Sequence, residues 1–288
     1  MRPVVVLGDL MVDVVARMAG PLAVGSDTPA SVTSRPGGAG ANVAAWLAVC
    51  GVPVTLIARA GDDDAARSAV EKLRGHGVDV SAVARDPDHA TGTCVVLVAP
   101  GGERTMLPDA GANAALDADD LPAAGFAAGA HLHVAGYALL RPGSRDAASE
   151  ALRQARAAGM TISVDPSSAA PLEALGAGRF LALAGHPDLL LPNAAEAAVL
   201  TGEPDAPAAG RALTTAAREV VVTLGAGGAL WTDGRVTIEA PATATGAVTD
   251  TTGAGDAFAA GFIAAWLDGA PPGAALERGH ALAGRALR

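Results

Sequence analysis

The stretch DTTGAGD at residues 250–256 passes directly into an apolar segment, AFAAGFI at 257–263, with no breaker before Gly269. The apolar segment predicts a helix that is buried on most sides. The glycines let the backbone turn so that unpaired N–H groups at the helix N-terminus point outward, which makes an anion site. Asp256 would lie in the first turn, where a carboxylate repels a phosphate unless it takes a proton from an attacking hydroxyl. The alternative is a plain glycine-rich cap in which Asp256 only favours the helix dipole.

Composition limits the classes of function. The chain has 288 residues, of which 50% are apolar, 17% charged and 3% aromatic, so it can bury a large core of small aliphatic side chains. A net charge of −10 argues against nucleic acid or an anionic membrane as the main partner. No stretch reads as a membrane span, and Cys50 and Cys94 have neither metal nor redox spacing. We therefore expect a cytoplasmic protein with two reduced cysteines.

Short apolar runs alternate with helical patterns along most of the chain. Strands are predicted at 4–8, 54–58, 131–135, 161–164, 188–191 and 219–224. Repeated βα units give a mostly parallel sheet that is covered on both faces. The turn PGGER at 100–104 predicts a hairpin that interrupts this alternation and pairs with residues 14–35 as a small appended sheet. No linker divides the chain, so we expect one domain over residues 1–288.

Polar residues follow the first strand and enter the first helix. Asp9 and Asp13 would lie past the strand end, at the sheet edge where ligands bind in open α/β proteins, although Asp13 could also be a turn or cap residue. The loop GGAGAN at 37–42 precedes a helix predicted at 43–50. Its glycines would let a polar ligand approach the backbone, and Asn42 offers a donor and an acceptor to a hydroxyl. The alternative is a plain turn and N-cap.

Two further patterns each allow a structural and a functional interpretation. Asn193 followed by Glu196 is the capping-box pattern, but Glu196 would also lie at the carboxyl edge of the sheet, where a Mg²⁺ ion and its waters could be held. His131 and His133 alternate on one predicted strand. Because no third ligand is near in the sequence, we favour a hydrogen-bonded structural pair over a metal site.

The motifs GGAGAN at 37–42, GANA at 111–114, NAAE at 193–196, VTLGAGG at 222–228 and DTTGAGD at 250–256 occur here in order. Together they resemble the ribokinase-like, or phosphofructokinase B, family of carbohydrate kinases over nearly the whole chain. The resemblance implies a three-layer α/β/α sandwich with a small β-sheet lid formed by segments near 12–35 and 91–110. It also implies transfer of the γ-phosphate of ATP to a hydroxyl of a small carbohydrate, with Mg²⁺ as cofactor. The exposed edge strands of the lid favour a homodimer.

The resemblance carries a role for each motif residue. Asp256 would be the general base, and the backbone N–H groups of Gly253, Ala254 and Gly255 would form the anion hole. The implied acceptor-binding residues are Asp13, Gly37, Gly38 and Asn42. The implied nucleotide-binding residues are Asn193, Glu196, Thr223, Gly225 and Gly228. Glu196 would order Mg²⁺ through water, and Asp250 would be the carboxylate of a monovalent-cation site for K⁺.

Three departures from ribokinases proper keep other functions open. Ala39 replaces a lysine, Met11 replaces an asparagine, and the chain stops at Arg288 within the final helix, where relatives continue. The first two weaken the case for ribose and favour, as the alternative, a nucleoside kinase of the adenosine or pseudouridine type. The third bears on adenine binding and makes K⁺ activation doubtful. A non-catalytic sugar- or nucleotide-binding protein is a further class, which the intact Asp256 opposes.

Overall fold

The main body of the protein is a nine-stranded sheet with the strand order β13-β12-β11-β10-β9-β8-β1-β4-β5. The computed structural model describes residues 1–242 and 253–287. The pairs β11–β12 and β12–β13 are antiparallel, and the other pairs in this sheet are parallel. The strands are β1 (Val4–Leu7), β4 (Val54–Gly61), β5 (Val83–Asp86), β8 (His131–Ala135), β9 (Thr161–Asp165), β10 (Leu189–Leu190), β11 (Glu219–Thr223), β12 (Ala229–Thr232) and β13 (Thr237–Ala240).

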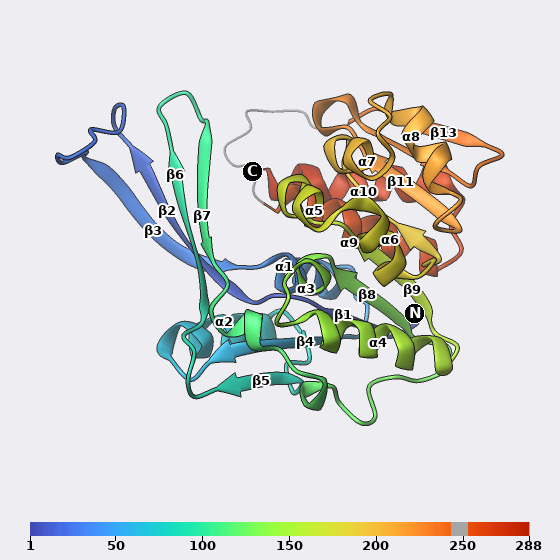
Figure 1. Ribbon diagram of the computed structural model, residues 1–288, viewed down its shortest axis with the longest axis horizontal. Helices are drawn as coiled ribbons and strands as arrows, with labels where there is room; N and C mark the ends of the chain where they lie inside the picture. The colour runs from blue at the N-terminus through green and yellow to red at the C-terminus, as the bar shows by residue number, and fades with distance from the viewer. Residues whose placement is uncertain (243–252, 288) are drawn as a thin grey trace.

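Side chains of the central strands enter two separate hydrophobic clusters. Val4 and Val6 of β1 belong to one cluster and Val5 and Leu7 to the other, as the alternation of side chains along a buried strand requires. The first cluster is covered by α1 (Ala39–Val49), α2 (Asp64–Gly75), α9 (Ala254–Leu267) and α10 (Pro272–Ala286). The second is covered by α3 (Tyr137–Leu140), α4 (Arg145–Ala157), α5 (Ala169–Leu175), α6 (Ala177–Ala184), α7 (Ala194–Thr201) and α8 (Ala206–Leu213). The predicted three-layer α/β/α sandwich is confirmed (Figure 1).

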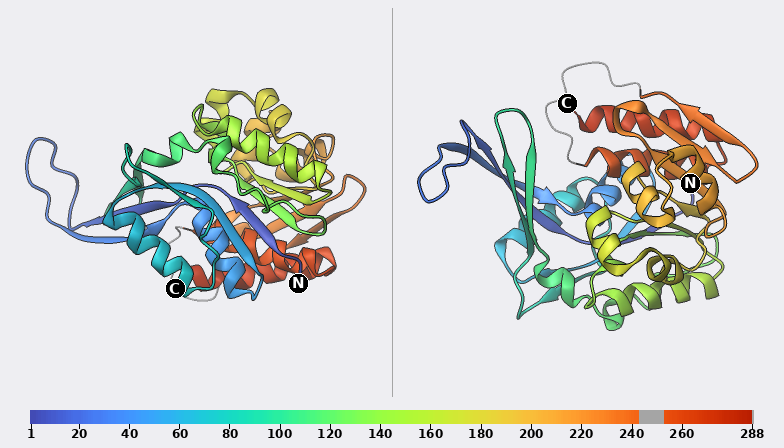
Figure 2. Two further views of the ribbon diagram at one scale, coloured as in Figure 1. Left: turned by 90° about the horizontal axis from the view of Figure 1, so that it is seen from below. Right: turned by 45° about the horizontal axis from the view of Figure 1, so that its top comes forward.

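A second sheet of four strands forms the lid. Its order is β3-β2-β6-β7, built from β2 (Met11–Met18), β3 (Ala30–Gly37), β6 (Gly92–Val98) and β7 (Arg104–Asp109). The predicted hairpin is the antiparallel pair β6–β7, and β6 joins β2 in parallel. Both lid segments are therefore where the sequence predicts them. The lid strands project away from the main sheet in all three views (Figures 1 and 2).

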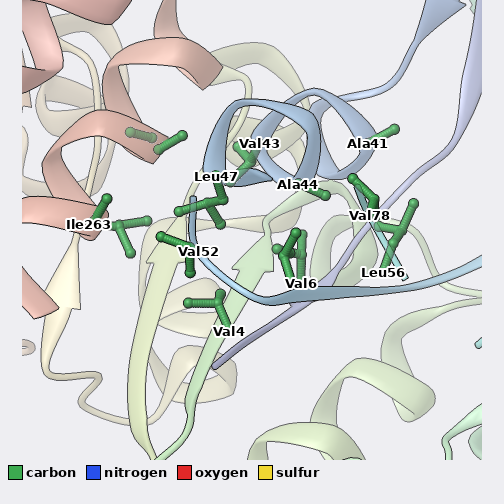
Figure 3. Packing of buried hydrophobic residues seen from close by; sticks show 14 of the residues in the cluster. Val4, Val6, Ala41, Val43, Ala44, Leu47, Val52, Leu56, Val78 and Ile263 are labelled. Carbon is green, nitrogen blue, oxygen red and sulfur yellow. The ribbon is translucent and has the colours of Figure 1, made fainter. Parts of the chain in front are cut away.

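Helices α1 and α9 pack on the sheet through buried apolar faces. Val43, Ala44 and Leu47 of α1 face Val4 and Val6 of β1, and Ile263 of α9 lies beside Leu47 (Figure 3). At the start of α1 the approach is closer still. A Cβ added to Gly40 would lie 2.7 Å from the Cα of Gly8, which a side chain does not allow. This packing brings the N-termini of α1 and α9 to the same edge of the sheet.

Two local predictions are wrong. The helix predicted at 43–50 begins at Ala39, so the second half of the GGAGAN loop is its first turn. Glycine has a low helix propensity, but the close contact with Gly8 requires it there. Asp13 is neither in a turn nor a cap, because it is the third residue of lid strand β2. The run 4–18 therefore crosses from the main sheet into the lid.

Candidate active site

The predicted base and one predicted acceptor residue are in direct contact. Asp256 lies in the first turn of α9, and Nδ2 of Asn42 in the first turn of α1 donates a hydrogen bond of 2.8 Å to its Oδ2 atom. Gly253 is the N-cap of α9 with φ of 76°, a left-handed conformation that favours glycine. The two residues are 214 positions apart in the chain. Their contact is the centre of the site.

The surroundings of Asp256 raise the pKa of its carboxyl to about 8. Burial is the main cause, and the negative charges of Asp165, Asp9 and Asp13 raise the pKa further, while the hydrogen bond from Asn42 lowers it. Part of the residue surface is still exposed, since it faces a cavity. A carboxyl with a pKa near the working pH is well suited to accept a proton.

The start of α9 is where the sequence analysis predicts an anion hole. The first helical hydrogen bond of α9 runs from the N–H of Ala257 to the C=O of Gly253. The N–H groups of Ala254, Gly255 and Asp256 precede it, in the turn whose amides have no acceptor within a helix. Gly255 and Asp256 both line a cavity of about 120 Å³. Backbone donors and the positive end of the helix dipole therefore meet this cavity.

The same cavity is lined by three of the predicted nucleotide-binding residues, Asn193, Glu196 and Thr223. The capping box is present: the backbone N–H of Asn193 donates to Oε2 of Glu196 at 2.9 Å, its Nδ2 donates to Oε1 at 2.7 Å, and the N–H of Glu196 donates to Oδ1 of Asn193 at 2.9 Å. The structural interpretation is therefore confirmed, and the same cap holds a buried carboxylate at the cavity wall.

Asp165, at the carboxyl end of β9, is a further acid in this cavity that the sequence analysis did not select. Burial and the charge of Glu196 raise its pKa, and burial raises the pKa of Glu196. Because ionisation of these two carboxyls is unfavourable, a cation bound between them would be stabilising. Carboxylate oxygen atoms are the ligands that Mg²⁺ prefers. Within residues 1–242 and 253–287, no three acidic, histidine or cysteine side chains lie close enough to ligate a metal together. Ligation through water fits that arrangement.

A second cavity, of about 150 Å³, lies on the other side of the Asn42–Asp256 pair. It is lined by Asp13, Arg35, Pro36, Asn42, Trp46, Gly253 and Ala286. Gly37 and Gly38 make room for it. A Cβ on Gly37 would lie 2.5 Å from the Asp13 carboxylate, and one on Gly38, whose φ is 97°, would lie 2.5 Å from the carbonyl oxygen of Asp9. Asp13 and Asn42 thus reach a shared cavity, while the glycines permit the close backbone packing around it.

Two predicted positions lie outside both cavities, and a third is not among the described residues. Gly225 is exposed in the turn after β11, beside Thr223, and does not line either cavity. Gly228 has φ of 103°, and a Cβ there would lie 2.2 Å from the carbonyl oxygen of Ala240, so a close approach to β13 explains this glycine. Asp250 lies outside the described residues. The described part of the chain therefore does not bear on a monovalent-cation site.

Two buried polar residues brace the root of the lid, and the sequence analysis missed their role. Asn113 is buried, accepts a hydrogen bond from the N–H of Leu10, and donates to the carbonyl oxygens of Leu10 and Ala110. It thereby ties the residue before β2 to the residue after β7. Asp9 accepts a hydrogen bond from the N–H of Gly40 at 3.2 Å. The sequence analysis noted the motif GANA at 111–114, which contains Asn113, but it assigned no role to that residue.

The histidine pair is structural, as expected. Nδ1 of His131 contacts the hydroxyl of Thr161 at 2.9 Å, and both histidines contact the hydroxyl of Ser163, at 2.7 and 2.8 Å. Burial holds the pKa of His131 at about 3 and that of His133 at about 4. Both side chains are therefore neutral at physiological pH.

No helix in the described residues is long and apolar enough to cross a membrane.

Known proteins resemble this chain over most of its length. It is 33% identical over 253 residues to the 2-dehydro-3-deoxygluconokinase of Bacillus subtilis (strain 168), which covers 85% of this chain and 78% of that protein. It is 34% identical over 278 residues to a fructokinase of Klebsiella pneumoniae, with 90% and 82% covered.

Solved structures agree with these relatives. Adenosine kinase from Sinorhizobium meliloti superimposes with a TM-score of 0.90 and 25% identity over 99% of this chain and 94% of that one. Fructokinase from Vibrio cholerae O395, in a form with bound fructose, ADP and calcium ion, superimposes with a TM-score of 0.84 and 28% identity, with 100% and 93% covered.

The family described as pfkB family carbohydrate kinase matches residues 1–288. The described geometry agrees with this match, because a helix N-terminus, a carboxylate and two cavities lie together at the carboxyl edge of the sheet. The chain therefore belongs to the pfkB family of carbohydrate kinases, which are phosphotransferases that act on sugar hydroxyls.

Proposed function

We propose that the protein transfers the γ-phosphate of ATP to a hydroxyl of a small carbohydrate, with Asp256 as the general base. One observation carries the assignment of the base. Asp256 lines the first cavity and accepts a hydrogen bond from Asn42, which lines the second, so we place the base at the boundary of the two cavities. A base at that boundary faces an acceptor on one side and a phosphoryl group on the other.

In the proposed reaction, the acceptor binds in the cavity lined by Asp13 and Asn42. A carboxylate and an amide at these positions accept and donate hydrogen bonds to sugar hydroxyls. Asp256 takes the proton of the attacking hydroxyl as the O–P bond forms and the bond to ADP breaks. The amides of Gly253, Ala254 and Gly255 stabilise the charge on the transferring phosphoryl group, so catalysis rests on alignment and charge stabilisation.

The other cavity would hold the nucleotide phosphates and Mg²⁺. The residues suited to the hydrated ion are Asn193, Glu196 and Asp165, because their oxygens line this cavity. When bound, Mg²⁺ neutralises phosphate charge. Asn193 keeps both carboxylate oxygens of Glu196 oriented through its two hydrogen bonds. Thr223 completes the wall on the nucleotide side, with Gly225 in the adjoining turn.

We further propose that residues 1–288 act as one kinase domain that dimerises through the lid. The outer face of the lid is mainly apolar, and it includes Val12, Val14, Ala16, Val95 and Leu97, with Val32 62% and Leu107 55% exposed. A second copy of the chain is the partner that this face fits, since it can cover the same apolar strip on both copies. Sedimentation of the wild type and of Val32→Glu tests this. A wild-type monomer would contradict it.

A nucleoside acceptor is the alternative. The likeness to an adenosine kinase structure supports it, and the named sugar kinases among the relatives support the carbohydrate assignment. The deciding experiment is to measure ATP consumption with Mg²⁺ against a panel of sugars, sugar acids, sugar phosphates and nucleosides. Turnover with a carbohydrate supports the proposal, and turnover with nucleosides alone supports the alternative. A protein that binds acceptors but consumes no ATP would contradict both kinase assignments and leave the binding-protein class.

A further inference from the structure

The arginines of the lid strands all lie on one face of the lid. Side chains alternate along a strand, and register partners on neighbouring strands share a face. Asp13 on β2 is the register partner of Arg35 on β3. Four residues further along β2, Arg17 is the partner of Val98 on β6, which is in turn the partner of Arg104 on β7. Asp13 and the three arginines therefore share one face.

The other face of these strands is nearly uncharged. Within strands 11–18, 30–37, 92–98 and 104–109, its one charged residue is Asp109, which is the register partner of Thr93. The asymmetry is pronounced for a chain whose net charge is −10. Positive charge is thus confined to one side of the lid strands.

The arginine face is turned toward the active site. Asp13 and Arg35 line one cavity together with Asn42 and Gly253, so both side chains reach the acceptor side of the base. Nε of Arg35 lies 3.8 Å from Oδ2 of Asp13, and the Arg35 side chain remains 39% exposed. The guanidinium is therefore held next to a predicted hydroxyl-binding carboxylate while part of it faces solvent.

An apolar strip separates the two rows of charge on this face. The buried side chains Met11, Val15, Cys94, Val96 and Val98 form a cluster of their own in the lid. Along β2, Asp13 and Arg17 are separated by about 13 Å, at about 3.3 Å per residue. A chain of five or six carbons, together with the flexible arginine side chains, spans that distance. The apolar side chains of this cluster are already buried, so they fix the strands that carry the charges, and the face combines a carboxylate at its base with arginines at both ends.

We propose that the acceptor carries an anionic group, a carboxylate or a phosphate ester, and that Arg35 binds it with help from Arg17 and Arg104. This inference rests on the proposed function, since it specifies the acceptor of the same reaction. Guanidinium groups match the planar oxygen pairs of carboxylates and phosphates, and a neutral sugar has no group that needs three of them. Asp13 and Asn42 would then bind the hydroxyl end, which presents the reacting hydroxyl to Asp256.

The test compares acceptors of different charge on the wild type and on Arg35→Gln. Fructose, 2-dehydro-3-deoxygluconate and ribose 1-phosphate serve as the neutral, carboxylate and phosphate probes. Binding is measured by calorimetry without ATP, and turnover is measured with ATP and Mg²⁺. We expect one anionic probe to exceed fructose in kcat/KM by roughly tenfold or more, and Arg35→Gln to reduce that selectivity by about 10- to 100-fold. The affinity for the anionic probe should also fall as the ionic strength rises.

Arg153→Gln is the matched control, because Arg153 is an exposed arginine on α4 that pairs with Glu150. It should leave selectivity unchanged. Higher activity with fructose than with either anionic probe would overturn the proposal but leave the proposed function intact. Equal losses for all probes in Arg35→Gln would overturn it as well. If no probe is phosphorylated, the proposed function fails, and calorimetry still decides this inference: binding of an anionic probe that Arg35→Gln abolishes supports it, and no binding of either anionic probe overturns it.

Discussion

The two cavities of the site differ in how the chain builds them. The nucleotide-side cavity is lined from the carboxyl ends of parallel strands and from the helices that follow them, including Asp165 after β9, Asn193 after β10 and Thr223 at the end of β11. Each of these positions is set by the main sheet. The acceptor-side cavity instead joins Asp13 and Arg35 of the lid to Asn42 of α1 and Gly253 of α9. Strand ends of the main sheet and the helices beside them build the first cavity, whereas the lid must meet helices α1, α9 and α10 to build the second.

This difference predicts where function tolerates change. Residues on the nucleotide side support a step common to all kinases of this kind, so their loss should affect every acceptor equally. Residues on the acceptor side depend on the position of the lid, so their loss should change KM and selectivity more than kcat. Asp256 lines the nucleotide side and is hydrogen-bonded to Asn42 on the acceptor side, and as the proposed base its substitution should have the largest effect.

We expect Asp256→Asn to lower kcat by about 10² to 10⁴, because the amide cannot accept the hydroxyl proton. Steady-state kinetics measures this, and calorimetry should show that acceptor binding is retained. Loss of binding in parallel with kcat would indicate a positioning role instead.

The same substitution should stabilise the protein without ligands above neutral pH. The pKa of Asp256 is about 8 in the folded protein, against an ordinary value of 3.8 for an aspartate side chain. The folded state therefore retains a proton that the unfolded state has released, and the stability of the wild type falls as the pH rises from about 4 to about 8. Asparagine removes that loss. The Tm of the variant should exceed that of the wild type at pH 8 to 9 by a few degrees, and the difference should shrink toward pH 4. Equal Tm values across this range would contradict the raised pKa.

On the nucleotide side, Glu196→Gln should reduce kcat/KM by about 10- to 100-fold at low Mg²⁺, with partial recovery at high Mg²⁺, because a carboxylate that orients the hydrated ion is lost. Binding of Mn²⁺, followed by electron paramagnetic resonance, gives a readout that is independent of turnover. Asp205→Ala is the matched control. Asp205 caps α8 through a hydrogen bond from the N–H of Ala208, and it does not line the cavity. It should cost about 1 kcal/mol of stability and no activity.

The pH dependence of kcat/KM separates the base from the rest of the site. A base must be ionised to act, so kcat/KM should rise with pH up to about 8 and level off above it, as the pKa of free Asp256 requires. A profile that is flat from pH 5 to pH 9 would contradict the assignment of Asp256 as the base.

At the lid root, Asn113→Ala should raise the KM for the acceptor several-fold with little change in kcat, because the roots of β2 and β7 lose their common tie. Removing a buried hydrogen-bonding side chain also costs about 1–3 kcal/mol. Hydrogen exchange of the lid strands should accelerate, whereas that of β8 and β9 should not. A uniform increase across both sheets would show global destabilisation rather than a role at the lid.

Much of the fold is predictable because it depends on local patterns. The apolar runs at 4–8 and 131–135 are strands, the turn at 100–104 joins a hairpin, and Asn193 with Glu196 forms a capping box. Each depends on residues within a few positions of one another. The helices α5, α6 and α8 were not predicted, because each has only seven or eight residues, too few to give a clear helical period.

The sequence by itself determined the α/β/α class and, through the family that its motifs resemble, the lid segments, and it predicted a base and an anion hole at the start of α9. Only the tertiary structure decided that Asp13 reaches the same cavity as Asn42, that Asn42 holds Asp256 and that Asp165 lines a cavity with Glu196. It also placed Arg17, Arg35 and Arg104 on the face of the lid that Asp13 shares. The physical reason is that these contacts join segments up to 214 residues apart, and their distances, burial and mutual charges exist only once the sheets and helices have packed.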